Sequence, residues 1–258
     1  MTIHPTAIIS EGAQLGAKVR IGPFTVIGPH VIIGSGTTIG GHAVIEGHTT
    51  IGADCRISHH VVIGTAPQDL KYKGEPTRLE IGDRNDIREF ATINIGTATG
   101  TGLTRVGSDN LLMAYTHIAH DCRVGDHVIL SNAVTLAGHV AIQDHATVGG
   151  LSAFHQFSRM GAFAFVGGCS AVSQDVPPFS LVAGNHAVLR GINVVGLRRN
   201  GFDEETITAV KKAIHLLRSR EFDHAQVLAQ LEDQLGRFDA VQRLITFVKE
   251  TRRGICKG

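Results

Sequence analysis

The chain has 258 residues, a formal net charge of +1 and a hydrophobic content of 43%. A charge so close to zero creates no field that would attract a polyanion, so the totals give no support to nucleic-acid binding. Residues 1–10 lack the basic and apolar segments of a signal peptide, and no stretch approaches the roughly 18 apolar residues of a membrane span. We therefore expect a cytoplasmic protein without a membrane span.

The composition is unusual for a globular core. The chain contains 31 glycines, no tryptophan and only 5% aromatic residues. These values favour a core of small and aliphatic side chains, with frequent tight turns. The cysteines form no CxxC pair, and we expect reduced thiols at Cys55, Cys122, Cys169 and Cys256.

An aliphatic residue recurs every six positions from Ile3. The first run is Ile3, Ile9, Leu15, Ile21, Ile27, Ile33, Ile39, Ile45, Ile51, Ile57 and Ile63. The position four residues later is always small, and glycine often follows the aliphatic residue, where we expect it to ease a turn. The period breaks at about 65–80 and 95–105. It then runs again from Val106 to Val172.

A period of six is neither the 3.6 of a helix nor the two of a half-buried strand. It is typical of short strands joined by tight turns, three to a coil, so that each coil takes 18 residues. Aliphatic side chains then point inward, and stacked coils pair in parallel. We expect a mainly β solenoid over residues 1–190. Its inserted loops at about 65–80 and 95–105 would project and could reach another subunit.

A helical pattern replaces the period of six beyond Pro177 and Pro178, which end the strand stack because proline lacks an N–H. We interpret residues 179–201 as a connection. Asp203 is a plausible N-cap for a first helix, whose apolar face would contain Ile207, Val210, Ile214 and Leu217. Further helices are predicted at about 223–235 and 239–252. Residues 191–258 would form a C-terminal helical domain.

Histidines gather on a short length of the predicted solenoid. Because residues 18 apart stack, His120 should lie under Gly138, and Gly138 under Gln156. Neighbouring places on these coils belong to His117, His139 and His155. Scattered surface histidines, a metal site and general acid–base chemistry all remain open. No Asp, Glu or Cys set completes an obvious ligand constellation, so we expect no metal.

Acyl transfer suits these residue types. A neutral imidazole at His120 could accept the proton of a hydroxyl that attacks a thioester, and Asp121 could orient the ring. The amide N–H of Gly138 could stabilise the developing oxyanion, although a corner glycine needs no such role. The chain has no GxSxG motif, and Cys122 falls at an inward position, so we predict direct transfer without an acyl-enzyme.

Specific segments extend the argument beyond the repeat. They are QDLKYKGEPTRLEIGDRN (68–85), SDNLLM (108–113), THIAHDC (116–122), LAGHV (136–140), HQF (155–157), VGGCS (166–170), QDVPP (174–178) and GNHA (184–187). Together with the hexads, they make the whole chain resemble the UDP-N-acetylglucosamine O-acyltransferases, which catalyse the first committed step of lipid A synthesis in Gram-negative bacteria.

The resemblance implies a left-handed parallel β-helix and a homotrimer with sites between neighbouring subunits. It implies acyl carrier protein as the donor, carrying phosphopantetheine, a UDP-amino sugar as the acceptor, and no cofactor of the enzyme's own. The apolar surface side chains that we expect a trimer to bury are Phe154, Phe157, Phe163 and Phe165.

The resemblance also implies a role for each matching residue. His120 matches the general base, Asp121 its partner and Gly138 the oxyanion donor. The residues that match those holding the sugar nucleotide or lining the acceptor and acyl pocket are Asp69, Lys71, His117, His139, His155, Gln156 and Asn193. Arg199 matches an arginine near the phosphopantetheine arm. Gly168 matches the position that limits acyl-chain length, where glycine leaves room for a long chain.

Four positions depart from the family pattern. The common IHRGT is INIGT here, so Asn94 and Ile95 replace a histidine and an arginine, while Val195 and Asn200 replace residues that are often acidic and basic. We expect all four on the nucleotide side, and a 3-amino analogue of the sugar remains an alternative acceptor. Other hexapeptide acyltransferases, a zinc-dependent carbonic anhydrase and a non-catalytic or ice-binding solenoid are the rival classes.

Overall fold

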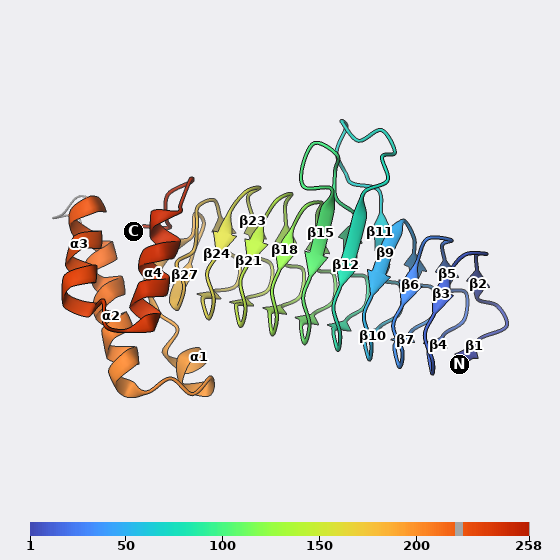
Figure 1. Cartoon of the computed structure of the whole chain (residues 1–258), viewed down its shortest axis with the longest axis horizontal. Helices are drawn as coiled ribbons and strands as arrows, with labels where there is room; N and C mark the ends of the chain where they lie inside the picture. The colour runs from blue at the N-terminus through green and yellow to red at the C-terminus, as the bar shows by residue number, and fades with distance from the viewer. Residues whose placement is uncertain (220–223, 258) are drawn as a thin grey trace.

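The computed structural model describes residues 1–219 and 224–257. Figure 1 shows a long solenoid that begins at the N-terminus and ends against a group of helices at the C-terminal end. No helix in these ranges is long and apolar enough to cross a bilayer. The strands build three sheets, here called A, B and C, which form the three faces of a left-handed parallel β-helix.

The strand bounds show the regularity of the coils. Sheet A contains β1 (Thr2–Ile3), β4 (Arg20–Ile21), β7 (Thr38–Ile39), β10 (Arg56–Ile57), β13 (Asp86–Ile87), β16 (Leu111–Leu112), β19 (Ile129–Leu130), β22 (Thr147–Val148), β25 (Phe165–Val166), β27 (Ser180–Ala183) and β28 (Val188–Ile192). Sheet B contains β2 (Ile8–Ile9), β5 (Val26–Ile27), β8 (Val44–Ile45), β11 (Val62–Thr65), β14 (Thr92–Asn94), β17 (His117–Ile118), β20 (Thr135–Leu136), β23 (Ala153–Phe154) and β26 (Ala171–Val172). Sheet C contains β3 (Gln14–Leu15), β6 (Ile32–Ile33), β9 (His48–Ile51), β12 (Arg78–Ile81), β15 (Leu103–Val106), β18 (Arg123–Val124), β21 (Ala141–Ile142) and β24 (Arg159–Met160).

The predicted inward column is present. In sheet B, for example, Ile118 of β17 pairs with Leu136 of β20, and both side chains are fully buried. Ile3 differs from these residues because its side chain is 38% exposed. It lies in the first coil, which no further coil covers. The hexad position therefore predicts the direction of a side chain, while burial also requires a coil on each side.

Glycines in the hexads act differently from our expectation. Of the glycines that follow an aliphatic residue in the first run, only Gly64 has a positive φ. Most of the others are needed because successive coils approach too closely for a side chain. A Cβ at Gly34 would lie 2.4 Å from the carbonyl carbon of Gly52, and one at Gly22 would lie 2.7 Å from that of Gly40. Their role is steric rather than conformational.

Two loops interrupt the coils where the period breaks. Residues 66–77 connect β11 to β12, and residues 95–102 connect β14 to β15. Both loops rise from one edge of the solenoid and lie beside each other (Figure 1). Each loop is shorter than its break in the period, because β12 and β15 begin to pair with each other ahead of their hexad positions.

The predicted connection at 179–201 is wrong in part. It contains β27, which pairs in parallel with β25, and β28, which turns back antiparallel to β27. It also contains the short helix α1 (Val194–Arg199). Phe179 begins this segment with a fully buried side chain, which explains why the chain stays packed against the last coil after the prolines.

Three longer helices follow: α2 (Glu204–Arg218), α3 (His224–Leu235) and α4 (Asp239–Lys249). The predicted cap is confirmed, because the Asp203 side chain accepts a hydrogen bond from the amide of Thr206 at 2.7 Å. The predicted start of a helix at 223 lies outside the described residues. The last helix ends at Lys249 instead of 252.

The expectation for the surface phenylalanines needs correction. Phe154 occupies the inward column and is only 2% exposed, so it cannot contribute to an interface. Phe163 packs its ring against His145 and Phe202 at the junction with the helices. Phe157 remains 51% exposed on the solenoid.

Replacing Ile93 by alanine should test the column. Ile93 is fully buried in the coil that carries the second loop, so we expect the free energy of unfolding to fall by about 2–5 kcal/mol. The matched control is Ile3→Ala, at the same hexad position of the uncovered first coil, which should cost clearly less. Unfolding followed by circular dichroism would compare them. Equal losses would contradict the proposed dependence on neighbouring coils.

Candidate active site

The site lies on the corner where the chain passes from sheet B to sheet C. His120, Gly138 and Gln156 occupy equivalent places in three successive coils, as the parallel registers of β17, β20 and β23 require. The amide of His139 donates to the carbonyl of His120 at 3.0 Å, which joins the first two of these corners. The predicted vertical order of the three residues is therefore present.

His120 and Asp121 form a hydrogen-bonded pair. Nδ1 of His120 lies 2.9 Å from Oδ2 of Asp121. An ionised carboxylate can only accept, so Nδ1 is the donor and the lone pair of the neutral ring lies on Nε2. The Asp121 side chain has no solvent exposure, while that of His120 keeps 16% of its surface exposed. Asp121 is therefore enclosed by the protein, while the His120 ring remains partly open to solvent.

The second loop surrounds the carboxylate of Asp121. Oδ2 accepts from the amide and the hydroxyl of Thr97, at 3.1 and 2.7 Å. Oδ1 accepts from the amide and the hydroxyl of Thr101, at 2.8 and 3.0 Å. Sequence reasoning missed both threonines. The signal that could have found them is the threonine-rich break at 95–105, which we interpreted only as a projecting loop.

The pKa of Asp121 reflects this environment. Burial by itself raises the pKa, but the hydrogen bonds from Thr97, His120 and Thr101 outweigh burial and bring it below its ordinary value. The carboxylate is therefore ionised at neutral pH. It can stabilise an imidazolium formed at His120.

Gly138 lies directly over the His120 ring. A Cβ at Gly138 would lie 2.7 Å from Nε2 and 2.5 Å from Cε1 of His120, so a side chain there would displace the imidazole. Among the described residues, its amide N–H has no backbone partner. Glycine at this corner therefore leaves room for the His120 ring directly against the main chain of residue 138.

Two further histidines surround the pair. The His139 ring lies edge-on to His120, with centroids 5.1 Å apart, and stacks on Phe157 at 4.4 Å. Burial lowers the pKa of His139, although the nearby carboxylate of Asp121 opposes the shift. His117 lies on the outward face of sheet B, where its Nδ1 is 2.7 Å from the hydroxyl of Thr92. Burial also lowers the pKa of His117. Both rings are therefore biased towards the neutral form.

A cavity of about 740 Å³ opens in front of His120. Its lining comes from the first loop, the second loop and the stacked corners: Gln68, Asp69, Leu70, Lys71, Thr99, His120, His139, Gln156 and Phe157. Asp69 and Lys71, far from His120 in sequence, thus share one cavity with it. Leu70 at the tip of the first loop is 97% exposed.

Other predicted residues lie elsewhere in this chain. Asn193 caps α1 by accepting from Gly196, and its amide donates to the carbonyl of Phe163. Arg199 is exposed in the last turn of α1, on the opposite edge of the solenoid from the loops (Figure 1). Gly168 lies on the corner between sheets A and B, across sheet B from His120. His155 precedes Gln156, but it does not line the cavity.

The location of the four departures on the nucleotide side stays a prediction, but Asn94 and Ile95 are only 3% and 5% exposed and therefore act from inside the protein. Asn94 donates to the hydroxyl of Thr65 at 2.9 Å and to the carbonyl of Ala66 at 3.1 Å, so it anchors the root of the first loop. Val195 is 61% exposed on α1. The side-chain amide of Asn200 donates to the carbonyl of Gly196 at 2.8 Å.

The structure also brings together a carboxylate and two histidines that the sequence did not identify as a set. One ligand atom each from His120, Asp121 and His139 lies within 4.8 Å of the others. The carboxylate, however, already accepts five hydrogen bonds from Thr97, Thr101 and His120. These donors use the lone pairs that a cation would need, so the arrangement favours an acid–base pair.

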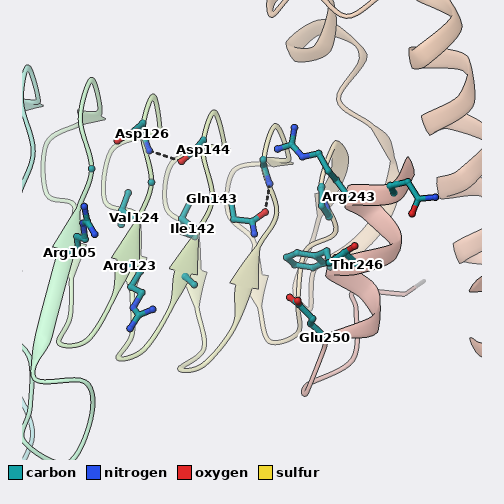
Figure 2. A pocket seen from close by; sticks show the side chains of 17 residues that line it. Arg105, Arg123, Val124, Asp126, Ile142, Gln143, Asp144, Arg243, Thr246 and Glu250 are labelled. Carbon is teal, nitrogen blue, oxygen red and sulfur yellow. Dashed lines mark hydrogen bonds between the residues drawn. The ribbon is translucent and has the colours of Figure 1, made fainter. Parts of the chain in front are cut away.

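A second groove, of about 700 Å³, lies between the outward face of sheet C and α4. Figure 2 shows Arg105 and Arg123 on the strands, Arg243 on α4 and Glu250 directly after this helix. Some of its polar groups connect coils: the amide of Asp126 donates to Asp144 at 2.9 Å, for example. His120 is not part of this lining. The groove therefore marks the junction of solenoid and helices rather than the candidate active site.

Cys122 is excluded as a nucleophile. Its side chain is fully buried beneath the corner, as the hexad predicted. Burial raises the pKa of its thiol to about 12, so a negligible fraction is thiolate at neutral pH.

Comparison with known proteins agrees with this geometry. A family model described as UDP N-acetylglucosamine O-acyltransferase, domain 2, matches residues 175–256. The bacterial transferase hexapeptide model (six repeats) matches residues 30–65 and 103–138. A curated relative from Anaeromyxobacter dehalogenans strain 2CP-1, named acyl-(acyl-carrier-protein)–UDP-N-acetylglucosamine O-acyltransferase, is 54% identical over 257 residues and covers 100% of both chains. A protein of the same name from Burkholderia mallei strain SAVP1 is 55% identical over 259 residues, covering 99% of each chain.

Solved structures give the same answer. LpxA from Acinetobacter baumannii superimposes with a TM-score of 0.97 at 43% identity, covering 100% of both chains. The UDP-N-acetylglucosamine acyltransferase of Francisella novicida gives a TM-score of 0.96 at 36% identity, covering 100% of this chain and 94% of that one. The resemblance found in the sequence is thereby confirmed. The chain belongs to the family of acyl-carrier-protein-dependent UDP-N-acetylglucosamine O-acyltransferases.

Proposed function

We propose that this chain transfers a 3-hydroxyacyl group from acyl carrier protein to the 3-hydroxyl of UDP-N-acetylglucosamine, the first step of lipid A biosynthesis. The observation that carries the proposal is the hydrogen-bonded His120–Asp121 pair, whose imidazole lies against Gly138 and lines the cavity. The names of full-length relatives at 54% and 55% identity supply the two substrates.

The chemistry needs one base and one oxyanion donor. Nε2 of His120 accepts the proton of the sugar hydroxyl, while the hydroxyl oxygen attacks the thioester carbonyl carbon. The tetrahedral oxyanion is stabilised by the amide of Gly138, and the imidazolium by the carboxylate of Asp121. Collapse forms the ester and breaks the carbon–sulfur bond. The imidazolium then returns the proton to the leaving thiolate of the carrier.

The substrates have separate positions in this scheme. Asp69 and Lys71 contact the sugar nucleotide, because the first loop brings them into the same cavity as His120. His139 and Gln156 line the acceptor pocket beside the base. No cofactor of the enzyme's own takes part, because phosphopantetheine arrives on the carrier protein. The reaction then belongs in the cytoplasm, where both substrates are made.

The complete site needs a second copy of the chain. Gly168, Asn193 and Arg199 lie away from the cavity of their own chain, so they can serve it only from a neighbour. The outward face of sheet B offers exposed apolar side chains for such contact in its first two coils, with Ile8 62% and Val26 36% exposed. We therefore propose a homotrimer, with residues 1–190 as the catalytic domain and 191–258 as the helical domain.

Replacing His120 by alanine should lower kcat by about 10²–10⁴-fold, because the general base is lost. The matched control is His127→Ala, an exposed histidine on the corner between sheets C and A. The measurement is transfer from a 3-hydroxyacyl carrier protein to UDP-N-acetylglucosamine, with sedimentation to verify assembly. Near-normal turnover by a folded His120→Ala enzyme would remove His120 from this role.

A second substitution tests the chain-length assignment. Gly168→Met should shift preference towards shorter acyl chains, since its side chain would occupy the open groove. The added Cβ would lie 3.2 Å from the carbonyl oxygen of Gly150, which requires only a small local shift. Gly191→Met, at a glycine with open space around it, is the control. An unchanged preference across a series of acyl carriers would contradict the assignment.

A further inference from the structure

The loop at 95–102 folds back onto the catalytic pair of its own chain. It departs from sheet B after β14 and returns at β15, and between these points it gives four hydrogen bonds to one buried carboxylate. The amide of Asp121 in turn donates to the hydroxyl of Thr104 at 2.8 Å. The loop therefore holds the side chain of Asp121, and the strand that follows it, β15, holds the Asp121 backbone.

Gly100 shows how closely the loop fits the carboxylate. A Cβ at Gly100 would lie 2.5 Å from Oδ2 and 2.6 Å from both Cγ and Oδ1 of Asp121. Its φ is not in the left-handed region, so the turn does not demand glycine for conformation. Glycine is needed here because a side chain would collide with the Asp121 carboxylate. The loop therefore packs closely around the carboxyl group.

We propose that Thr97 and Thr101 are positioning residues that fix the Asp121 carboxylate against Nδ1 of His120, and so direct Nε2 at the acceptor hydroxyl. This inference rests on the proposed acyl transfer by His120. Neither threonine lines the cavity, whereas Thr99 between them does. The loop therefore separates two tasks, with Thr99 facing substrate and its neighbours facing the catalytic pair.

Bond geometry explains why two threonines are needed. Each carboxylate oxygen has one threonine hydroxyl and one amide, and Oδ2 also has His120. With both oxygens occupied, the carboxyl group cannot rotate without breaking charge-assisted bonds, which are stronger than neutral ones. The His120 ring donates to Oδ2, so the fixed carboxylate also fixes the orientation of the ring.

The same contacts predict a change in the pH profile. The groups facing the carboxylate are His120, His139, whose Nε2 is 3.9 Å from Oδ2, and the buried thiol of Cys122, while Asp69 and Lys71 lie across the cavity. The threonine hydroxyls lower the pKa of Asp121 against the effect of burial. Removing them leaves burial to raise that pKa. The pair then takes up a proton at higher pH, and the acid limb of the kcat profile moves upward.

The experiment compares Thr97→Val, Thr101→Val and the double variant with Thr97→Ser, which keeps the hydroxyl. Each valine should lower kcat by ~10- to 100-fold, as loss of one hydrogen bond to a charged group predicts. The KM for UDP-N-acetylglucosamine should change little, and serine should restore most of kcat. Because Thr101 is exposed, its variant keeps a readout even if Thr97→Val folds poorly.

The matched control is Thr37→Val. Thr37 is fully buried, donates to the carbonyl of Gly52 and accepts from the amide of Cys55, far from the site. It should lose stability without moving the pH profile. Wild-type kcat and an unmoved acid limb in folded Thr101→Val and double variants would overturn the proposal, as would the same kinetic changes in Thr37→Val. Failure of the wild-type chain to transfer acyl groups would instead overturn the proposed function.

Discussion

Parallel hydrogen bonding between successive coils is the interaction on which this molecule depends. Each coil donates its amides to the carbonyls of the next, so residues of adjacent coils stand one above the other with little freedom to shift. This spacing places a bare glycine over an imidazole at 120 and 138, close enough that no side chain fits between them. In this chain, the register that repeats from coil to coil is what places His120 and Gly138 next to each other.

The two loops that interrupt the repeat line the cavity and hold Asp121. The regular coils supply positions, and polar side chains such as those of Asn110 and Asp144 join one coil to the next. The two insertions supply what the coils lack. The first loop brings Asp69 and Lys71 to the cavity, and the second surrounds the carboxylate of Asp121. Asn94, at the base of both, is buried and ties the first loop to the solenoid. The scaffold is thus rigid, and the insertions determine what it does.

A three-sided prism also limits what one chain can contribute. Side chains on different corners cannot converge, since a whole sheet separates them. Gly168 and the α1 residues therefore lie away from His120 of their own chain, and sheet B separates Gly168 from His120. The proposal of a site shared between copies follows from this shape. In that site, His120 and Asp121 of one chain would act on the proton, while residues of the neighbouring chain would bind the long substrates.

The sequence by itself determined the solenoid, its corners and the vertical order of His120, Gly138 and Gln156, because a strict period leaves a single way to stack coils. It also identified the Asp203 cap, which depends on contacts within a few residues. Tertiary structure decided what the period does not encode. The strands at 180–192, the burial of Phe154 and Asn94, and the enclosure of Asp121 by Thr97 and Thr101 all depend on segments that meet only after folding. Loop residues follow no repeat, so their partners could not be read from spacing alone.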